Sequence, residues 1–311
     1  MLRRSILFAI AALSLIGGCA RLPDTGVTPL KPATLSELQG YLRDHKPDLD
    51  QFRLRGPFAV TVRKDHELRL SATERVSADL FLSAPAEKAA LVIFLHGYES
   101  SKEAHEYQAR HVASWGMHGL ALQLPNNGPW VGNGRILARL VQAIHRAPEI
   151  VDSRIDVNRI ILVGHSFGGS SVAIALAEGA PAAGGILLDP AGIGKDLPGF
   201  LKKIHRPVIL LWADEQVSAT RNREYFYRFI PGGVAEISIR NAAHEDAQYP
   251  SELSLHGLGF DPITTEELQI TFVSALTSAA FSLSATGKFD YAWASFRAPL
   301  ENGRFFDARK K

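Results

Sequence analysis

The chain has 311 residues, of which 46% are hydrophobic and 21% charged, a composition that excludes intrinsic disorder, collagen and disulfide-rich scaffolds. Its 34 Lys and Arg residues and 32 Asp and Glu residues leave a formal charge of +2, too balanced for binding nucleic acid mainly through phosphate neutralisation. The single cysteine, Cys19, excludes an intramolecular disulfide and a zinc site built from several thiolates. We therefore expect a folded protein with no nucleic-acid partner.

Residues 1–18 have the pattern of an export signal. Arg3 and Arg4 precede an apolar run from Ile6 to Ile16, which is about half of the length that crosses a hydrocarbon core. Gly17-Gly18-Cys19 follows this run and resembles the lipobox of bacterial lipoproteins. The resemblance implies cleavage before Cys19 and lipidation of its thiol, and Ala20 in the next position implies the outer membrane, facing the periplasm. A secretory signal with a chance cysteine is the alternative.

Residues 19–55 are predicted to form a lipid anchor, a tether and an entry segment. The prolines between Pro23 and Pro32 suit a spacer rather than a core. A short helix capped by Thr34 or Ser36 is expected before Gly56-Pro57, which ends any helical pattern. The remaining residues, 56–311, show no internal repeat, so one domain is the simplest division.

Short apolar runs alternate with helical stretches in residues 56–311. This order predicts an α/β fold with a mostly parallel, doubly wound sheet of about eight strands and helices on both faces. Alternating patterns predict edge strands at Phe58–Val62, Leu68–Leu70 and Val76–Leu82, whereas continuous apolar runs predict buried strands at Leu91–Leu95, Leu120–Leu124, Ile160–Val163, Gly185–Leu188 and Val208–Leu211. Helices are expected over Glu106–Trp115, Gly134–His145 and Gly168–Glu178. The connection from Pro190 to Pro207 is too short for a large lid domain.

The motif Gly164-His165-Ser166-Phe167-Gly168 lies between a predicted strand and a predicted helix. A nucleophile elbow needs a sharp strand-to-helix turn that holds the serine in a strained backbone conformation, and glycines on both sides let the strand and helix approach closely. The helix N-terminus also favours negative charge beside the serine oxygen. The motif therefore predicts that Ser166 is a nucleophile.

A serine nucleophile needs a base and an orienting acid, in the chain order serine, acid, histidine. His244 follows the predicted strand Val234–Arg240, in a loop from which a base reaches back to the elbow, whereas His205 precedes the favoured acid and His256 is expected in a surface loop. Two aspartates end apolar strands. We favour Asp214, whose strand is nearer in sequence to His244, and keep Asp189 as the alternative acid.

The developing oxyanion needs two backbone donors. In a serine hydrolase these are the N–H of the residue after the nucleophile, here Phe167, and one from the loop after an earlier strand, for which we choose Tyr98 in His96-Gly97-Tyr98. Trp130 and Trp212 are candidates for an aromatic substrate wall, and the loop 126–134 is a candidate specificity loop. His96 is expected to shape its loop rather than transfer protons.

Together these residues resemble the α/β-hydrolase family, in particular its dienelactone-hydrolase-like and chlorophyllase- or polyester-hydrolase-like branch. The resemblance covers about residues 56–285 and rests on Gly56-Pro57-Phe58, His96-Gly97-Tyr98, Gly164–Gly168, Trp212-Ala213-Asp214 and His244. Chlorophyllase-like members place an acid in a Leu-Asp-Pro segment, which stands here at Leu188-Asp189-Pro190 and keeps Asp189 open. The resemblance implies a catalytic domain over residues 56–311 that cleaves a carboxylic ester.

We expect a small-molecule or lipid-like ester as substrate, and neither a cofactor nor a metal. The histidines His96, His105 and His111, and the run His244-Glu245-Asp246, lack the His-Glu-x-x-His spacing of zinc hydrolases. Two alternatives to an ester hydrolase stay open. The first is an envelope lipoprotein that uses the fold for binding without catalysis. The second is a peptidase or acyltransferase that uses the same triad. The sequence carries no signal for an oligomeric state.

The lipobox interpretation predicts that Cys19→Ser releases the mature protein from membranes. Without the thiol no diacylglycerol is attached, and the remaining chain has no predicted anchor of its own. Fractionation of cells that express wild-type and Cys19→Ser protein measures this. Identical membrane association of the two proteins would contradict the lipoprotein interpretation.

Overall fold

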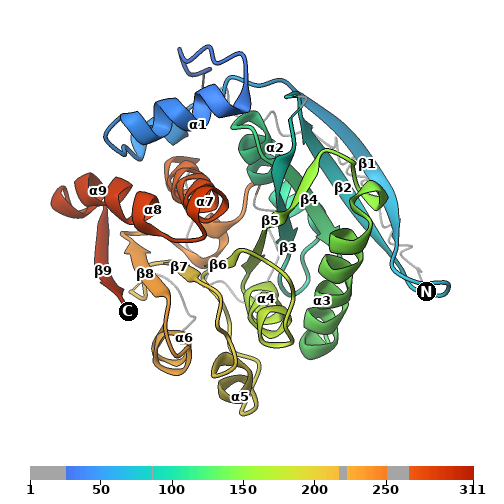
Figure 1. Cartoon of the computed structure of the whole chain (residues 1–311). Coiled ribbons are helices and arrows are strands. Elements are labelled where there is room, and N and C mark those ends of the chain that lie inside the picture. Colours follow the sequence, from blue (N-terminus) through green and yellow to red (C-terminus); the bar gives the residue numbers. More distant parts are fainter. Residues whose placement is uncertain (1–25, 86, 217–222, 251–265) are drawn as a thin grey trace, which may run out of the picture.

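The computed structural model describes residues 26–85, 87–216, 223–250 and 266–311 (Figure 1). The predicted export signal, Cys19 and His256 lie outside these residues. The described residues form one sheet of nine strands in the order β1-β2-β4-β3-β5-β6-β7-β8-β9. The strands are β1 (Val60–Arg69), β2 (Arg75–Ser83), β3 (Ala89–Leu95), β4 (His118–Gln123), β5 (Ile155–His165), β6 (Gly184–Leu188), β7 (Val208–Trp212), β8 (Val234–Ile239) and β9 (Phe305–Lys310).

The central strands, β3 to β8, run parallel to one another, and β1, β2 and β9 pair antiparallel at the two edges. Parallel strands must be covered on both faces, and every residue of β3, β6 and β7 is buried. This confirms the predicted α/β fold with a mostly parallel sheet. After β4 the chain crosses past β3 to form β5 on its other side, so β3 and β5 lie beside each other in the middle of the sheet.

The helices lie on both faces of this sheet (Figure 1). They are α1 (Leu35–Asp44), η1 (Asp50–Arg53), η2 (Lys102–His105), α2 (Glu106–Ser114), α3 (Trp130–Arg146), η3 (Pro148–Ile150), α4 (Phe167–Ala177), α5 (Leu197–Leu201), α6 (Arg223–Phe229), η4 (His244–Ala247), α7 (Glu266–Thr286), α8 (Asp290–Ser295) and α9 (Arg297–Glu301). Alternate residues of β3 divide the core. Leu91 and Ile93 pack in the cluster that contains α3 and α4, whereas Val92 and Phe94 pack in the cluster that contains α1, α2 and α7.

The structure differs from the local expectations at four places. The alternating runs from Phe58 and Leu68 belong to one long strand, β1, which has a register shift between Arg63 and His66. The helix expected from Gly134 begins at Trp130, so the second half of the candidate loop 126–134 is helical. Strand β9 was not predicted. Leu38 and Leu42 of α1 belong to the core, so the folded domain extends further toward the N-terminus than residue 56.

The C-terminal aromatic residues pack on the domain. Tyr291 of α8 lies edge-on against Phe281, with ring centroids 4.9 Å apart, and accepts a hydrogen bond from Gln51 Nε2 at 2.7 Å. Helix α7, which lies beside α8, is long and apolar enough to span a membrane by length and composition. Because 89% of its most apolar window is buried inside the protein, it serves as a core helix of this domain.

Several histidines are buried in the core. Burial lowers the pKa of His105, His111 and His118 to about 4 in each case. His111 lies on α2 and its Nε2 donates to the carbonyl oxygen of Phe52 at 2.8 Å, so a neutral ring satisfies the contact. A histidine whose folded pKa is depressed binds its proton only in the unfolded chain between pH 6.5 and 4. Its stabilising contribution is therefore present above that window and lost as pH falls through it.

We predict that His111→Gln makes the protein less sensitive to acid. The glutamine amide donates to Phe52 but does not titrate, so the free energy of unfolding should fall by on the order of 2 kcal/mol less than in wild type between pH 7 and pH 5. Urea unfolding at both pH values measures the difference. An equal loss in both proteins would show that His111 is not a source of the acid sensitivity.

Candidate active site

Ser166 stands at the turn between β5 and α4, with backbone angles φ 54° and ψ −126°. A serine rarely adopts a positive φ, and such a residue costs about 1–3 kcal/mol that the surrounding structure must supply. The turn is also crowded: a Cβ on Gly164 would lie 2.3 Å from the Gly168 carbonyl oxygen, and one on Gly168 would lie 2.4 Å from that of Leu95. The Gly-x-Ser-x-Gly motif therefore has the geometry of a nucleophile elbow, as its sequence predicted.

His244 begins η4 in the loop after β8, and its imidazole is held by Asp189. The distance from His244 Nδ1 to Asp189 Oδ2 is 2.5 Å, and the Asp189 side chain is 2% exposed. The other carboxylate oxygen, Oδ1, accepts the backbone N–H of Ala213 at 3.1 Å. A proton on Nδ1 leaves the lone pair of Nε2 available as a base. Ser166 and His244 line the same pocket.

The preference for Asp214 as the acid is corrected, because its carboxylate is used elsewhere. Asp214 Oδ2 accepts the N–H of Asn241 at 2.9 Å, and Oδ1 accepts that of Gln216 at 3.1 Å. Its own N–H donates to the carbonyl oxygen of Ala242 at 2.9 Å. Asp214 therefore holds the loop that carries His244, and the alternative acid, Asp189, is the one that contacts the imidazole.

His165 is a site residue that sequence reasoning missed. It lies directly before Ser166, and its Nε2 donates to the backbone carbonyl oxygen of His244 at 3.0 Å. The two rings are 4.4 Å apart between centroids. Burial and the neighbouring His244 hold the pKa of His165 well below its usual range, so the ring is neutral. No local pattern reveals this contact, because its partners are 79 residues apart in sequence.

The loop after β3 lies against the serine. A Cβ on Gly97 would be 2.8 Å from Ser166 Cβ. The two predicted oxyanion donors, Tyr98 and Phe167, both line the pocket of Ser166, and their rings meet edge-on at 6.4 Å. The described residues that line this pocket are Gly97, Tyr98, Glu99, Ser100, His165, Ser166, Phe167, His244, Glu245 and Gln248. The backbone N–H groups of Tyr98 and Phe167 thus belong to the two segments that flank Ser166.

The two predicted wall tryptophans have different environments. Trp130 stacks on Phe167 with ring centroids 5.1 Å apart and an interplanar angle of 15°, so it supports a residue that lines the pocket. Trp212 is buried in the core, packs against Phe226 and donates from Nε1 to Glu236 Oε2 at 3.0 Å. Its assignment to the substrate wall is corrected, because its ring lies within the core around β7.

The histidines and carboxylates considered for a metal do not gather into a ligand set. Within residues 26–85, 87–216, 223–250 and 266–311, no group of three or more His, Cys, Asp or Glu side chains is arranged to hold a metal ion. His96 is buried, with Nδ1 donating to the Gly97 carbonyl oxygen at 3.0 Å and Nε2 accepting the Leu124 N–H at 3.2 Å. It shapes the loop after β3, as expected.

Comparison with known protein families assigns the fold to a family. The family model described as the alpha/beta hydrolase family matches residues 92–301, which is more than half of the chain. The chain belongs to the alpha/beta hydrolase family. No curated protein matches it. The matched range begins in β3 and includes the elbow, Asp189 and His244, so the family assignment covers the candidate site and supports hydrolase activity in general.

We predict that Asp189→Asn and Asp214→Asn separate the two acids. An amide has one acceptor oxygen, whereas Asp189 uses one oxygen for His244 and the other for Ala213. Asp189→Asn should therefore remove the low-field proton resonance expected of His244 Nδ1–H. Asp214→Asn should retain it and lose about 1–3 kcal/mol of stability, because one of two backbone N–H groups loses its acceptor.

Proton NMR and thermal unfolding of both variants check these outcomes. The opposite pattern, with the resonance kept in Asp189→Asn and lost in Asp214→Asn, would restore Asp214 as the acid.

Proposed function

We propose that this protein is a serine hydrolase that cleaves a carboxylic ester through an acyl-enzyme, with Ser166, His244 and Asp189 as its triad. The observation that carries the proposal is the meeting, at one pocket, of a serine with a positive φ and a histidine whose Nδ1 lies 2.5 Å from a buried carboxylate. A nucleophile and a base that is oriented by a third group are the parts that acyl transfer requires.

Acylation begins when Ser166 Oγ attacks the ester carbonyl carbon while His244 Nε2 removes its proton. The carbonyl oxygen becomes an oxyanion, for which the N–H groups of Phe167 and Tyr98 are the proposed donors. The intermediate then collapses. The bond to the alcohol oxygen breaks, the alcohol leaves with the proton from His244, and the acyl group stays on Ser166.

Deacylation repeats the same steps with water. The water oxygen attacks the acyl carbon while His244 Nε2 takes a proton from the water. His244 then gives this proton to Ser166 Oγ as the carboxylic acid leaves. Asp189 favours the imidazolium that forms in each half-reaction, because its carboxylate is buried and already oriented by the Ala213 N–H. The barrier is therefore lowered without rearrangement of the charge partners.

A small-molecule or lipid-like ester is the substrate that the site supports best. The described chain has no large lid domain, and the pocket wall combines the aromatic Tyr98 and Phe167 with polar groups. The resemblance to dienelactone-hydrolase-like and chlorophyllase- or polyester-hydrolase-like enzymes supports the same class. With the lipobox pattern at Cys19, we propose a lipid-anchored hydrolase of the bacterial envelope that acts in the periplasm.

We predict that a fluorophosphonate probe labels the wild-type protein and not Ser166→Ala. The probe reacts only with a serine oxygen that a base has activated. Hydrolysis of short p-nitrophenyl esters should fall by at least about 10³-fold in the variant, because both half-reactions need Ser166 Oγ.

Two other outcomes separate the alternatives. A folded wild-type protein that takes no label and cleaves no ester would favour a binding lipoprotein without catalysis. A labelled protein that transfers the acyl group to an added alcohol in preference to water, or that cleaves amides faster than esters, would favour an acyltransferase or a peptidase.

A further inference from the structure

We propose that Gln123 is a positioning residue that holds together the two ends of the loop 96–102, and so fixes the place of the Tyr98 oxyanion donor. This inference rests on the proposed function, because it concerns the geometry of the same site. The one observation behind it is that a single amide, at the end of β4, contacts both the first and the last residue of this loop.

At the start of the loop, Gln123 meets His96. Its Nε2 lies 3.1 Å from His96 Nε2 and 3.0 Å from the Leu124 carbonyl oxygen. Because His96 Nδ1 donates to the Gly97 carbonyl oxygen, His96 Nε2 carries a lone pair, which accepts from both Gln123 Nε2 and the Leu124 N–H. Burial lowers the pKa of His96, which keeps the ring neutral and preserves this direction of donation.

At the end of the loop, Gln123 meets Lys102. Its Oε1 accepts the backbone N–H of Lys102 at 3.0 Å. The Gln123 amide therefore donates to His96, the first residue of the loop, and accepts from Lys102, the last residue. An amide carries a donor and an acceptor side by side, so one side chain makes both contacts.

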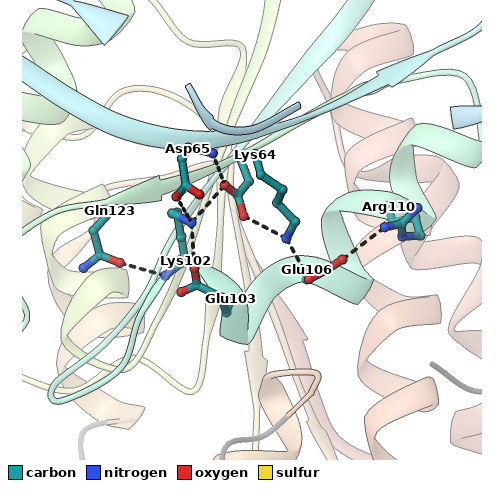
Figure 2. A network of polar contacts seen from close by, with 8 residues as sticks. Lys64, Asp65, Lys102, Glu103, Glu106, Arg110 and Gln123 are labelled. Carbon is teal, nitrogen blue, oxygen red and sulfur yellow. Dashed lines mark hydrogen bonds and ion pairs between the residues drawn. The ribbon is translucent and has the colours of Figure 1, made fainter. Parts of the chain in front are cut away.

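Lys102 is itself anchored, as Figure 2 shows. Its side chain is 7% exposed, and Nζ lies 2.9 Å from both Asp65 and Asp79 and 2.6 Å from Glu103. Burial opposes the charge of Lys102, but the hydrogen bonds that Nζ donates to these carboxylates outweigh it and raise the pKa of Lys102, so its ammonium group stays charged. The far end of the loop is thus tied to β1, β2 and η2, and Gln123 connects this anchored end to His96.

The middle of the loop is held by the segment that follows Gln123. Asn126 Nδ2 donates to the Ser100 carbonyl oxygen at 3.0 Å, and the Asn126 carbonyl oxygen accepts the N–H of Glu99 at 2.8 Å. Tyr98 lies between these contacts and Gly97. An oxyanion donor acts only when its N–H already points at the place where charge develops, and a misplacement of about 1 Å costs up to about 10²-fold in rate.

The test compares Gln123→Met and Gln123→Glu with wild type and with Gln51→Met. Methionine keeps the length of glutamine and removes its hydrogen bonds to His96, Lys102 and the Leu124 carbonyl oxygen. Gln51 is also a half-buried glutamine that donates to a side chain, Tyr291, on a different part of the molecule, so it controls for the loss of such a bond. We expect kcat for a p-nitrophenyl ester to fall about 10- to 100-fold in Gln123→Met, with KM little changed, and to stay at the wild-type value in Gln51→Met.

Gln123→Glu gives a readout that loss of packing would not produce. The introduced carboxylate can still accept from the Lys102 N–H, but it repels the lone pair of His96 Nε2 unless the carboxylate and the imidazole share one proton. Sharing stabilises the protonated pair and so raises its pKa in the folded protein. The favourable contact is therefore present at low pH and lost as pH rises. The ratio of variant to wild-type kcat should therefore fall as pH increases.

Three charged or titratable groups of the described residues surround this pair. They are Glu103, whose charge opposes the lowering of the His96 pKa by burial, His105, whose pKa burial lowers to about 4, and the paired ammonium of Lys102. Because these groups are the same in wild type and variant, the ratio removes their common contribution.

An unchanged kcat in Gln123→Met overturns the inference and leaves the proposed function standing. If Gln123→Met does not fold, as judged by thermal unfolding, Gln123→Glu decides: a ratio that falls with pH supports the inference, and a ratio independent of pH overturns it. A folded wild-type protein that neither takes the fluorophosphonate label nor hydrolyses the ester overturns the proposed function, and the inference with it.

Discussion

The backbone of Ser166 is the constraint on which the site depends. A positive φ at serine is unfavourable, and it persists only because its surroundings leave no other conformation. The Ser166 N–H donates to the Leu188 carbonyl oxygen at 3.0 Å, and the Ser166 carbonyl oxygen accepts the N–H of Ala191 at 3.0 Å. The elbow is therefore tied on both sides of the serine to the segment that contains Asp189, so the proposed nucleophile and the proposed acid are positioned by the same contacts.

The order of the strands brings the other groups to that point. Gly97, Ser166, Asp189 and Asp214 follow β3, β5, β6 and β7, which are consecutive neighbours in the sheet, and all four strands end at the same edge. His244 comes from β8, one strand further away, and has to reach back across β7. Asp214 makes this reach possible because its carboxylate and its N–H hold residues 241 and 242 of the returning loop. Asp214, which is nearer to His244 in sequence, thus holds the loop, whereas the more distant Asp189 contacts the imidazole.

The buried ionisable groups around the site differ in charge: the histidines are neutral, and Lys102 is charged. His96, His105 and His165 stay neutral, because losing a proton costs an imidazole less than carrying a charge out of water. Lys102 remains charged because three carboxylates surround it, and the same contacts lower the pKa of Glu103 to about 2. The neutral histidines offer directional hydrogen bonds near the serine, and the charged Lys102 anchors the edge of the sheet to the loop. Gln123 lies between His96 and Lys102 and contacts both.

Local sequence was sufficient for the parts of this protein whose physical cause is local. Continuous apolar runs indicated the buried parallel strands, glycines on both sides of Ser166 indicated the elbow, and the loop after the strand Val234–Ile239 indicated His244. The acid could not be chosen in this way, because Asp189 and Asp214 each follow an apolar strand and have the same local pattern. The assignment of Trp212 to the substrate wall was wrong for a similar reason. A tryptophan at a strand end faces either the pocket or the core, and the pleat of the assembled sheet decides which. The sequence alone determined the fold class and singled out Ser166 and His244 as the candidate nucleophile and base. Only the tertiary structure decided which carboxylate contacts His244, and that Gln123 and His165 contact residues 21 and 79 positions away. These contacts depend on strand order and loop reach rather than on any local preference.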